Sequence, residues 1–205
     1  MLAKQIVVLA NSIKHGNHCV AGKCLATGEW VRPVSSVYGD ALNDDQIRCR
    51  NPYGLYKVKT LQKVMIEFDS AVPLLNQPEN HLIAANSEWQ QNYNIRQHEL
   101  SQYLDEPISL WGKGCRVAYS AMVQNQCKPE QSLFLVQTEG LELHYTAENK
   151  RRVRFVYKGI RYDLPATDPQ FDSLVNERRD VQGILCISLG ENLDGHCYKI
   201  VAAIY

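Results

Sequence analysis

Three groups of residues carry the side chains best suited to binding chemistry, and the first lies near the N-terminus. Ser12, Lys14 and His15 follow an apolar, β-branched run at residues 4–10. A hydroxyl, an ammonium and an imidazole in a loop just after a buried strand suit the binding of a nucleic acid or nucleotide, because loops on a rigid scaffold often carry binding groups. A solvated polar turn explains the same residues equally well.

The second group combines an aromatic ring, a cation and amides. Trp30 and Arg32 alternate along a predicted strand and would share one face. An arginine beside an aromatic suits base stacking with phosphate pairing, although a core tryptophan flanked by a structural arginine is the commoner use of such a pair. Gln77, Glu79 and Asn80 occupy a predicted loop, where they would read a base edge or a sugar hydroxyl, or else cap a following helix.

The third group is a cationic strand in the second half of the chain. Six of the twelve residues from 150 to 161 are Lys or Arg, and none is acidic. Alternation along the strand places Arg152, Arg154 and Lys158 opposite an apolar face, and Lys158-Gly159 is predicted to form a hairpin tip. Such a strand predicts a wall for a nucleic-acid backbone.

No catalytic or cofactor signature accompanies these groups. The sequence contains no phosphate-binding loop, no His-Glu-x-x-His, no Gly-x-Ser-x-Gly and no zinc-deaminase motif. We therefore predict no catalytic residue and no cofactor. The nearest approach to a metal site is His15, His18, Cys19 and Cys24, but on a strand the two thiols would point to opposite faces. The seven scattered cysteines favour reduced, buried thiols rather than disulfides or zinc ligands.

Composition places the chain among ordinary globular proteins. It has 205 residues, 45% of them hydrophobic, and its 22 basic side chains balance 22 acidic ones. The regions differ: residues 1–68 carry nine basic and five acidic side chains, and residues 69–109 carry one and six. A gathered cationic face can hold a polyanion even at zero net charge. No apolar run reaches the ~20 residues of a membrane span, and no secretory signal is recognisable, so we expect a cytoplasmic protein without a membrane partner.

Hydrophobic periodicity indicates a mainly β chain. Strands are expected at 4–10, 18–26, 29–35, 61–70, 133–137, 141–145, 151–157, 160–164, 184–189 and 198–204. Asn11-Ser12 is expected to begin a loop, Thr27-Gly28 predicts a hairpin, and the polar stretch before residue 61 is expected to be loop or short helix. Helical spacing of Trp89, Tyr93 and Leu100 predicts a helix at Ser87–Leu104.

Two consecutive motifs resemble the opening of a known family: Val7-Val8-Leu9-Ala10-Asn11-Ser12-x-Lys14-x-Gly16-x-x-Cys19-Val20-Ala21-Gly22 and Thr27-Gly28-Glu29-Trp30-Val31-Arg32-Pro33-Val34-Ser35. Shorter matches follow in order: Gln77-Pro78-Glu79-Asn80, Leu110-Trp111, Ser132-Leu133, Phe155-x-Tyr157-x-Gly159-x-x-Tyr162, Thr167-Asp168-Pro169, Ser188-Leu189-Gly190-Glu191 and Tyr198-Lys199. Over nearly its whole length the chain resembles the bacterial dual OB-fold domain proteins. The resemblance implies two OB-like barrels in tandem and a nucleic-acid-binding role, and it carries over no catalytic residue.

We therefore expect two tandem OB-like small β-barrels, the first at residues 1–115 with a short helical insertion at about 71–110, and the second at 116–205. Our first hypothesis is a module that binds single-stranded DNA or RNA through cations and aromatics. The alternatives are a nucleotide sensor or small nucleotide-processing enzyme with a polar pocket in the first barrel, and an adaptor for a protein partner. An open groove, a closed polar pocket and an exposed apolar patch would distinguish the three.

Overall fold

The chain, seen in a computed structural model, divides into two compact units. The structure describes residues 2–14, 16–85, 87–177 and 181–205, without the side chain of Lys14. The first unit comprises Met1–Leu74 and Pro78–Tyr103, and the second comprises Leu75–Gln77 and Leu104–Tyr205. The second unit thus begins before the boundary that the sequence predicted between residues 115 and 116, and it includes three residues from the middle of the first unit's sequence.

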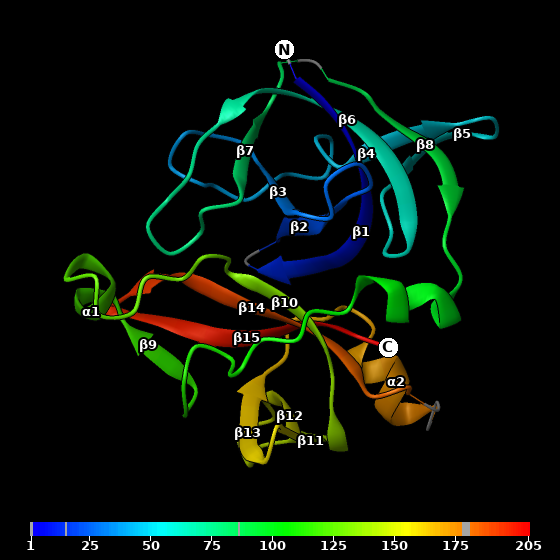
Figure 1. Cartoon of the computed structure of the whole chain (residues 1–205). Helices are drawn as coiled ribbons and strands as arrows, with labels where there is room; N and C mark the ends of the chain where they lie inside the picture. The colour runs from blue at the N-terminus through cyan, green and yellow to red at the C-terminus, as the bar shows by residue number, and fades with distance from the viewer. Residues whose placement is uncertain (1, 15, 86, 178–180) are drawn as a thin grey trace. The chain divides into compact units, whose positions relative to one another are not determined.

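The first unit is a closed five-stranded barrel (Figure 1). Its strands are β1 (Leu2–Lys14), β2 (Asn17–Cys24), β3 (Trp30–Val34), β7 (Asn80–Ile83) and β6 (Gln62–Ala71). Neighbours in this order are paired, and β6 pairs back onto the first half of β1, which closes the barrel. Among the described pairs of these five strands, β3 and β7 are parallel and the others are antiparallel.

Strand β1 pairs with β6 and with β2 along its two edges, and it contains a bulge. Residues 2–7 pair with β6 and residues 6–14 pair with β2, with a register shift between Val8 and Ala10. At this shift Val8 lies opposite Gly22, where a Cβ atom would come within 2.1 Å of the carbonyl oxygen of Val7. The bulge therefore requires glycine on the facing strand. The barrel interior is filled by apolar side chains that include Ile6, Val64 and Phe68, as the alternation of residues 61–70 predicted.

Three more strands extend the barrel wall beyond β6. They are β8 (Trp89–Asn94), β4 (Arg48–Asn51) and β5 (Gly54–Lys57), joined in the order β6-β8-β4-β5. We call these three strands the sheet extension; they lie beside one another in Figure 1. The polar stretch that was expected to be loop or short helix thus contains the β4–β5 hairpin.

The helix predicted at Ser87–Leu104 was wrong. Residues 89–94 form β8, and only Gln97–Tyr103 is helical, as a 3-10 turn named η1. Trp89 is fully buried among barrel residues, whereas Tyr93 is 73% exposed, so the two do not share one buried helical stripe. Backbone pairing of residues 89–94 with β6 and β4 makes this segment a strand, so the helical spacing of Trp89, Tyr93 and Leu100 was a coincidence.

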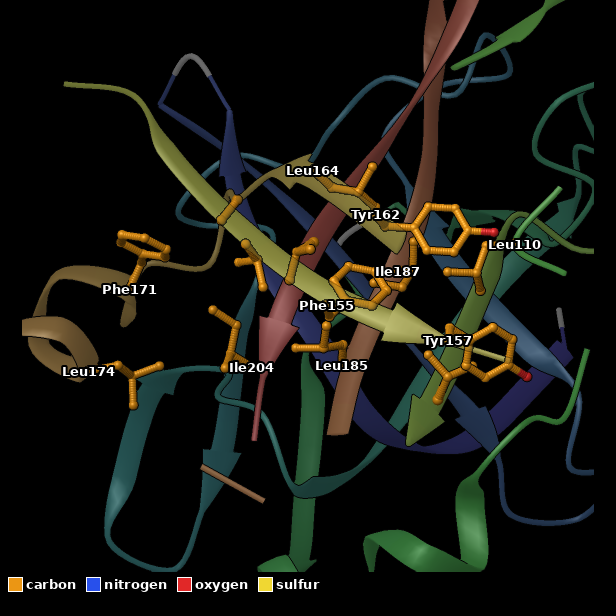
Figure 2. Close-up of a cluster of buried hydrophobic side chains, with 14 residues drawn as sticks. Leu110, Phe155, Tyr157, Tyr162, Leu164, Phe171, Leu174, Leu185, Ile187 and Ile204 are labelled. Carbon is orange, nitrogen blue, oxygen red and sulfur yellow. The ribbon is translucent and has the colours of Figure 1, made fainter. Parts of the chain in front are cut away.

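The second unit contains two antiparallel sheets and two short helices. A four-stranded sheet has the order β10 (Leu133–Gln137), β14 (Ile184–Leu193), β15 (His196–Ile204) and β9 (Arg116–Ala118). A three-stranded sheet consists of β11 (Glu139–Tyr145), β12 (Arg151–Tyr157) and β13 (Ile160–Pro165), and the helices are α1 (Tyr119–Val123) and α2 (Phe171–Asn176). One cluster joins both sheets and α2 around Phe155, Leu185 and Phe171 (Figure 2).

The mainly β fold is confirmed, with 53% strand and 9% helix in a closed barrel and a curled half-barrel sheet. Both predicted hairpins are present. Lys158 and Gly159 have φ of 46° and 75° and connect β12 to β13 as a two-residue turn, whereas Thr27-Gly28 lies in a longer connection between β2 and β3. In the described part of the chain, no helix is long and apolar enough to span a membrane.

Candidate functional site

The first predicted group lies on strand rather than in a loop. Asn11 and Ser12 continue β1, paired with Val20 and Cys19, so the loop expected at Asn11-Ser12 was wrong. Ser12 is 6% exposed. His15 and the side chain of Lys14 lie outside the described residues. The strand continues because β2 supplies partners for its backbone as far as Lys14.

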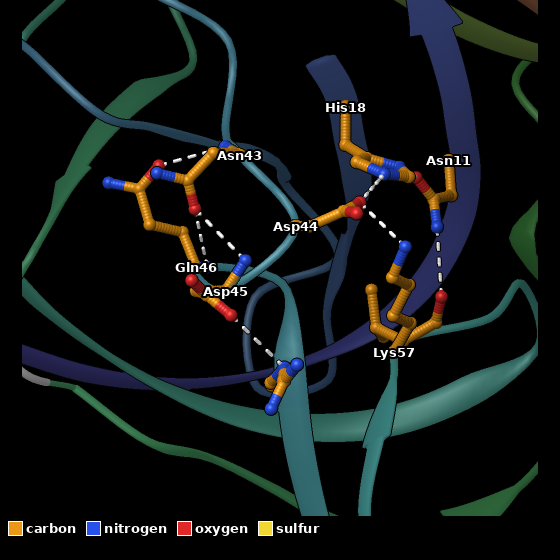
Figure 3. A network of polar contacts seen from close by, with 9 residues as sticks. Asn11, His18, Asn43, Asp44, Asp45, Gln46 and Lys57 are labelled. Atoms are coloured by element: carbon orange, nitrogen blue, oxygen red, sulfur yellow. Dashed lines mark hydrogen bonds and ion pairs between the residues drawn. The ribbon is translucent and has the colours of Figure 1, made fainter. Parts of the chain in front are cut away.

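A polar network lies beside this part of β1 (Figure 3). The buried ring of His18 places Nδ1 2.9 Å from Asn11 Oδ1 and Nε2 2.9 Å from Asp44 Oδ1. Asn11 Nδ2 donates to the carbonyl of Val58, so Asn11 offers an acceptor to the ring. Asn11 and Asp44 thus hold the two ring nitrogens of His18 from opposite sides. Hydrogen bonds from Lys57 and then His18 lower the pKa of Asp44.

The second predicted group is brought together in part. The parallel pairing of β3 with β7 places Arg32 opposite Asn80, and the amide of Arg32 donates to the carbonyl of Glu79. The guanidinium of Arg32 lies 3.3 Å from Glu79 Oε1, and all three residues are buried. Gln77 belongs to the second unit, where it donates to the carbonyl of Leu189.

Trp30 lies on the same buried face as Arg32. It is 5% exposed, and the ammonium of Lys23 lies 5.4 Å from its ring centre. The structure thus matches the structural use of this pair rather than an open stacking platform. Nearby, burial lowers the pKa of His81, whose Nδ1 hydrogen-bonds the Glu79 carbonyl. This group is a network of buried charges that satisfy one another.

The third predicted group shares one face of β12, but acidic neighbours accompany it. Glu142 and Asp163 are the cross-strand partners of Arg154. Arg154 Nη1 lies 2.6 Å from Glu142 Oε2, and Arg152 Nε lies 2.9 Å from Asp163 Oδ1. Burial acts to raise the pKa of Asp163, but Arg152 and His144 outweigh it and the pKa falls. Lys158 is exposed at the hairpin tip and donates to the carbonyl of Glu106.

The cationic face of the second unit is therefore charge-compensated. Each of its two central arginines has a carboxylate within 4 Å. Sequence reasoning placed the cations correctly and missed the acids, because Glu142 and Asp163 come from neighbouring strands whose register the sequence does not display.

Exposed tyrosines on the sheet extension form a group that the sequence reasoning missed. Tyr53 at the β4–β5 turn is 86% exposed, Tyr56 on β5 is 50% exposed and Tyr93 on β8 is 73% exposed. Tyr56 donates to the carbonyl of Tyr53, and its ring lies over Gly54, which stiffens the hairpin. We call these three residues the tyrosine group. In the sequence, the indication of this group was the Tyr53-Gly54 pair, which is typical of a turn. It lies in the polar stretch that was expected to contain no strands.

Some cations near the tyrosine group are already paired with carboxylates, and one is not. Arg50 is held by Glu88, at 2.5 and 2.7 Å, and this pairing lowers the pKa of Glu88. Lys57 is held by Asp44 at 2.7 Å. Lys63, by contrast, lies directly opposite Tyr93 in the β6–β8 register and forms no ion pair with any residue that the structure describes. A tyrosine beside an uncommitted lysine offers both a stacking face and a phosphate contact.

The described residues provide no group of three or more His, Cys, Asp or Glu placed to hold a metal ion. Cys19 and Cys24 lie five residues apart on β2 and so point to opposite faces, and His15 is outside the described residues. All seven cysteines are free thiols. The four at 24, 49, 186 and 197 are buried as predicted, those at 19 and 127 are partly buried, and Cys115 is exposed, contrary to the prediction.

Comparison with known proteins gives one match. Residues 4–204 match the model of a family described as a dual OB-containing domain. No curated protein and no solved structure matches the chain.

Proposed function

The chain belongs to the dual OB-containing domain family, and from this premise we propose that it is a module that binds single-stranded nucleic acid on the sheet extension of its first unit. OB barrels commonly bind oligonucleotides on a strand face, but the fold also serves other ligands. The proposal therefore rests on the side chains that this surface presents.

The observation that carries the proposal is the tyrosine group. Large aromatic side chains are usually at least partly buried, and three that stand in solvent on neighbouring elements offer ring faces for stacking. Strands β5 and β8 are two positions apart in the sheet, about 10 Å. In the strand register Tyr56 shares the face of Cys49 and Trp89, whereas Tyr93 lies with Lys63 on the opposite face. A single nucleic-acid strand would reach both rings by passing around β5, the last strand in the sheet order.

Charge supports a binding mode that depends more on stacking than on phosphate pairing. Arg48, Arg50 and Lys57 on the extension are already engaged by Asp45, Glu88 and Asp44. Lys63 is the cation best placed to meet a phosphate beside a stacked base. The proposal keeps nucleic acid as the ligand and moves the principal contacts from Trp30, Arg32, Arg152 and Arg154 to the sheet extension.

The test measures fluorescence polarisation of labelled oligo-dT and oligo-U with the parent chain and with Tyr53→Ala, Tyr56→Ala and Tyr93→Ala. Each loss of a stacked base should weaken binding by ~1–3 kcal/mol, about 5- to 150-fold. Tyr38→Ala is the matched control, since Tyr38 is 80% exposed in the same unit but lies outside the extension. A parent that binds neither oligomer, or tyrosine variants that bind like the control, would remove the proposal.

A further inference from the structure

A cavity of about 670 Å³ opens in the first unit beside the sheet extension. This volume lies within the range of ~300–1,000 Å³ that is usual for small-molecule sites. Leu55, Leu82, Ile83 and Ala84 supply apolar wall from β5, β7 and the residue that follows β7. Except for Ala85, the remaining wall is polar and comes from the connection between β3 and β4, from β4, from β6, and from the segment before β8.

One polar wall is held in a fixed shape by its own hydrogen bonds (Figure 3). Asn43 Oδ1 accepts from the amides of Asp45 and Gln46, each at 3.0 Å, and Gln46 Oε1 accepts from the amide of Asn43 at 2.9 Å. The oxygens of both carboxamides are thereby used. Both residues line the cavity, and their NH2 groups donate to no residue in the described ranges.

The carboxylates that line the cavity differ in whether they already have hydrogen-bond or ion-pair partners. Asp45 pairs with Arg48 at 3.3 Å, and Glu88 pairs with Arg50 outside the cavity. Asp69 on β6 makes no hydrogen bond or ion pair with the residues that the structure describes. The lining of the cavity thus includes an uncommitted carboxylate at Asp69, two carboxamides with uncommitted NH2 groups at Asn43 and Gln46, and the buried hydroxyl of Ser87, which has no hydrogen-bond partner among the described residues.

This pattern matches one nucleobase. Guanine has a donor pair at N1–H and N2–H2 that a carboxylate accepts with both oxygens, and it has acceptors at O6 and N7 that carboxamide NH2 groups can reach. Adenine lacks the N1–H donor and reverses the polarity at position 6. Three carboxylates against one guanidinium in the lining also disfavour a phosphate inside the cavity.

We propose that this cavity binds a guanine base, with Asp69 accepting from its Watson–Crick edge and the apolar wall contacting its faces. Arg48 on β4 and Leu55 on β5 line the cavity, so it adjoins the hairpin that carries Tyr53 and Tyr56. Reading of one guanine within a bound strand rests on the proposed function. Binding of the free nucleoside does not.

The experiment titrates the full chain with guanosine, inosine, adenosine and agmatine by ligand-observed NMR. Guanosine should bind; inosine, which lacks only the N2 amino group, should bind more weakly, and adenosine should show no saturable binding. Asp69→Asn should weaken guanosine binding at least tenfold. Glu67→Gln is the matched control, because Glu67 is an exposed acid on the same strand that does not line the cavity.

Several outcomes would overturn the inference. They are no guanosine binding, equal binding of adenosine, tighter binding of agmatine (which would make the cavity a site for organic cations), and an Asp69→Asn variant that binds guanosine like Glu67→Gln. A thermal melt of each variant excludes loss of fold. Oligo-dT contains no guanine, so oligo-dT binding without guanosine binding defeats this inference alone. The reverse result defeats the tyrosine surface alone.

Discussion

Lys199 shows how one buried side chain organises a loop in the second unit. Its ammonium is fully buried and donates to the carbonyls of Gly112 at 2.7 Å and Gly114 at 2.9 Å. It also lies 5.4 Å from the centre of the Tyr162 ring, and the Tyr162 hydroxyl donates to the same Gly112 carbonyl. Burial lowers the pKa of Lys199 to about 8. The residue therefore links the stability of the second unit to alkaline pH.

Replacing Lys199 by Met tests this link. The variant leaves carbonyls of the loop without their donor, which should cost ~1–3 kcal/mol near neutral pH. Between pH 8 and 10.5 the unfolded wild type binds more protons at this residue than the folded one, so the wild-type free energy of unfolding should rise relative to the variant. The rise is bounded by roughly 3 kcal/mol. Urea unfolding at several pH values in this window measures it, and a constant difference would contradict the assignment.

Asp44 should give a pH dependence of the same sign in the first unit, but at acid rather than alkaline pH. Its pKa is lowered by hydrogen bonds from Lys57 and His18, so its contribution to stability is present above the ordinary aspartate value and is lost as pH falls through the folded value. Asp44→Asn should be less stable than the wild type at roughly pH 6, and the difference should be smaller at roughly pH 3, below the ordinary aspartate pKa. Chemical denaturation at both pH values checks this, and a difference that is undiminished at the lower pH would count against the network.

At the scale of elements, the β1 bulge is the feature that most constrains the first barrel. It lies in β1 just after the residues that pair with both β2 and β6, and the Val7 carbonyl lies against Gly22 on β2. No flexible side chain can move aside there, because the nearest atoms are backbone. The barrel closure therefore depends on a residue without a Cβ atom.

Gly22→Ala should destabilise the chain by about 1–3 kcal/mol or more, through overpacking against backbone. Gly28→Ala is a matched control in the following connection. Gly28 has φ of 73° with open space around its Cα, so this change should cost only the roughly 1–2 kcal/mol of a left-handed alanine. Thermal and urea unfolding measure both variants. A Gly22→Ala variant as stable as Gly28→Ala would show that the barrel relaxes at the bulge.

At the scale of the whole molecule, compensation of charge is the dominant electrostatic property. The 22 basic and 22 acidic side chains cancel overall, and the structure pairs Arg50, Arg151, Arg152 and Arg154 with carboxylates at 2.5–2.9 Å. A single-stranded nucleic acid bound to the sheet extension would release few of its counterions, because most cations on the extension already pair with carboxylates.

Binding of oligo-dT should therefore depend only weakly on salt. One or two phosphate contacts predict a slope of log affinity against log salt of about −0.7 to −1.4. Lys63→Ala should remove most of this slope, while Tyr93→Ala should weaken binding and leave the slope nearly unchanged. Polarisation titrations across a range of salt concentrations measure both effects. A slope several times steeper would mean that a cationic surface other than the sheet extension carries the binding.

The sequence by itself predicted most of the strands, though not β4, β5, β7, β8 or β9, and it predicted the hairpin between β12 and β13. Alternation of Val64, Ile66 and Phe68 indicated a half-buried strand, and Lys158-Gly159 predicted a two-residue turn whose positive φ angles the structure contains. These features depend on neighbours within a few residues, since a strand has a period of two and a tight turn has its own residue preferences. The β-branched run at the N-terminus likewise predicted most of β1.

Tertiary structure decided which of the chemically capable residues face solvent. Trp30 and Arg32 looked like a binding pair, but the parallel pairing of β3 with β7 brings Glu79 to Arg32 and the group is buried. The tyrosine group and the cavity at Asp69 are assembled from strands up to 40 residues apart, as the pairing of Cys49 with Trp89 shows. Local periodicity reports which face of an element is apolar, whereas exposure, ion pairing and cavities depend on which distant segment lies against that face.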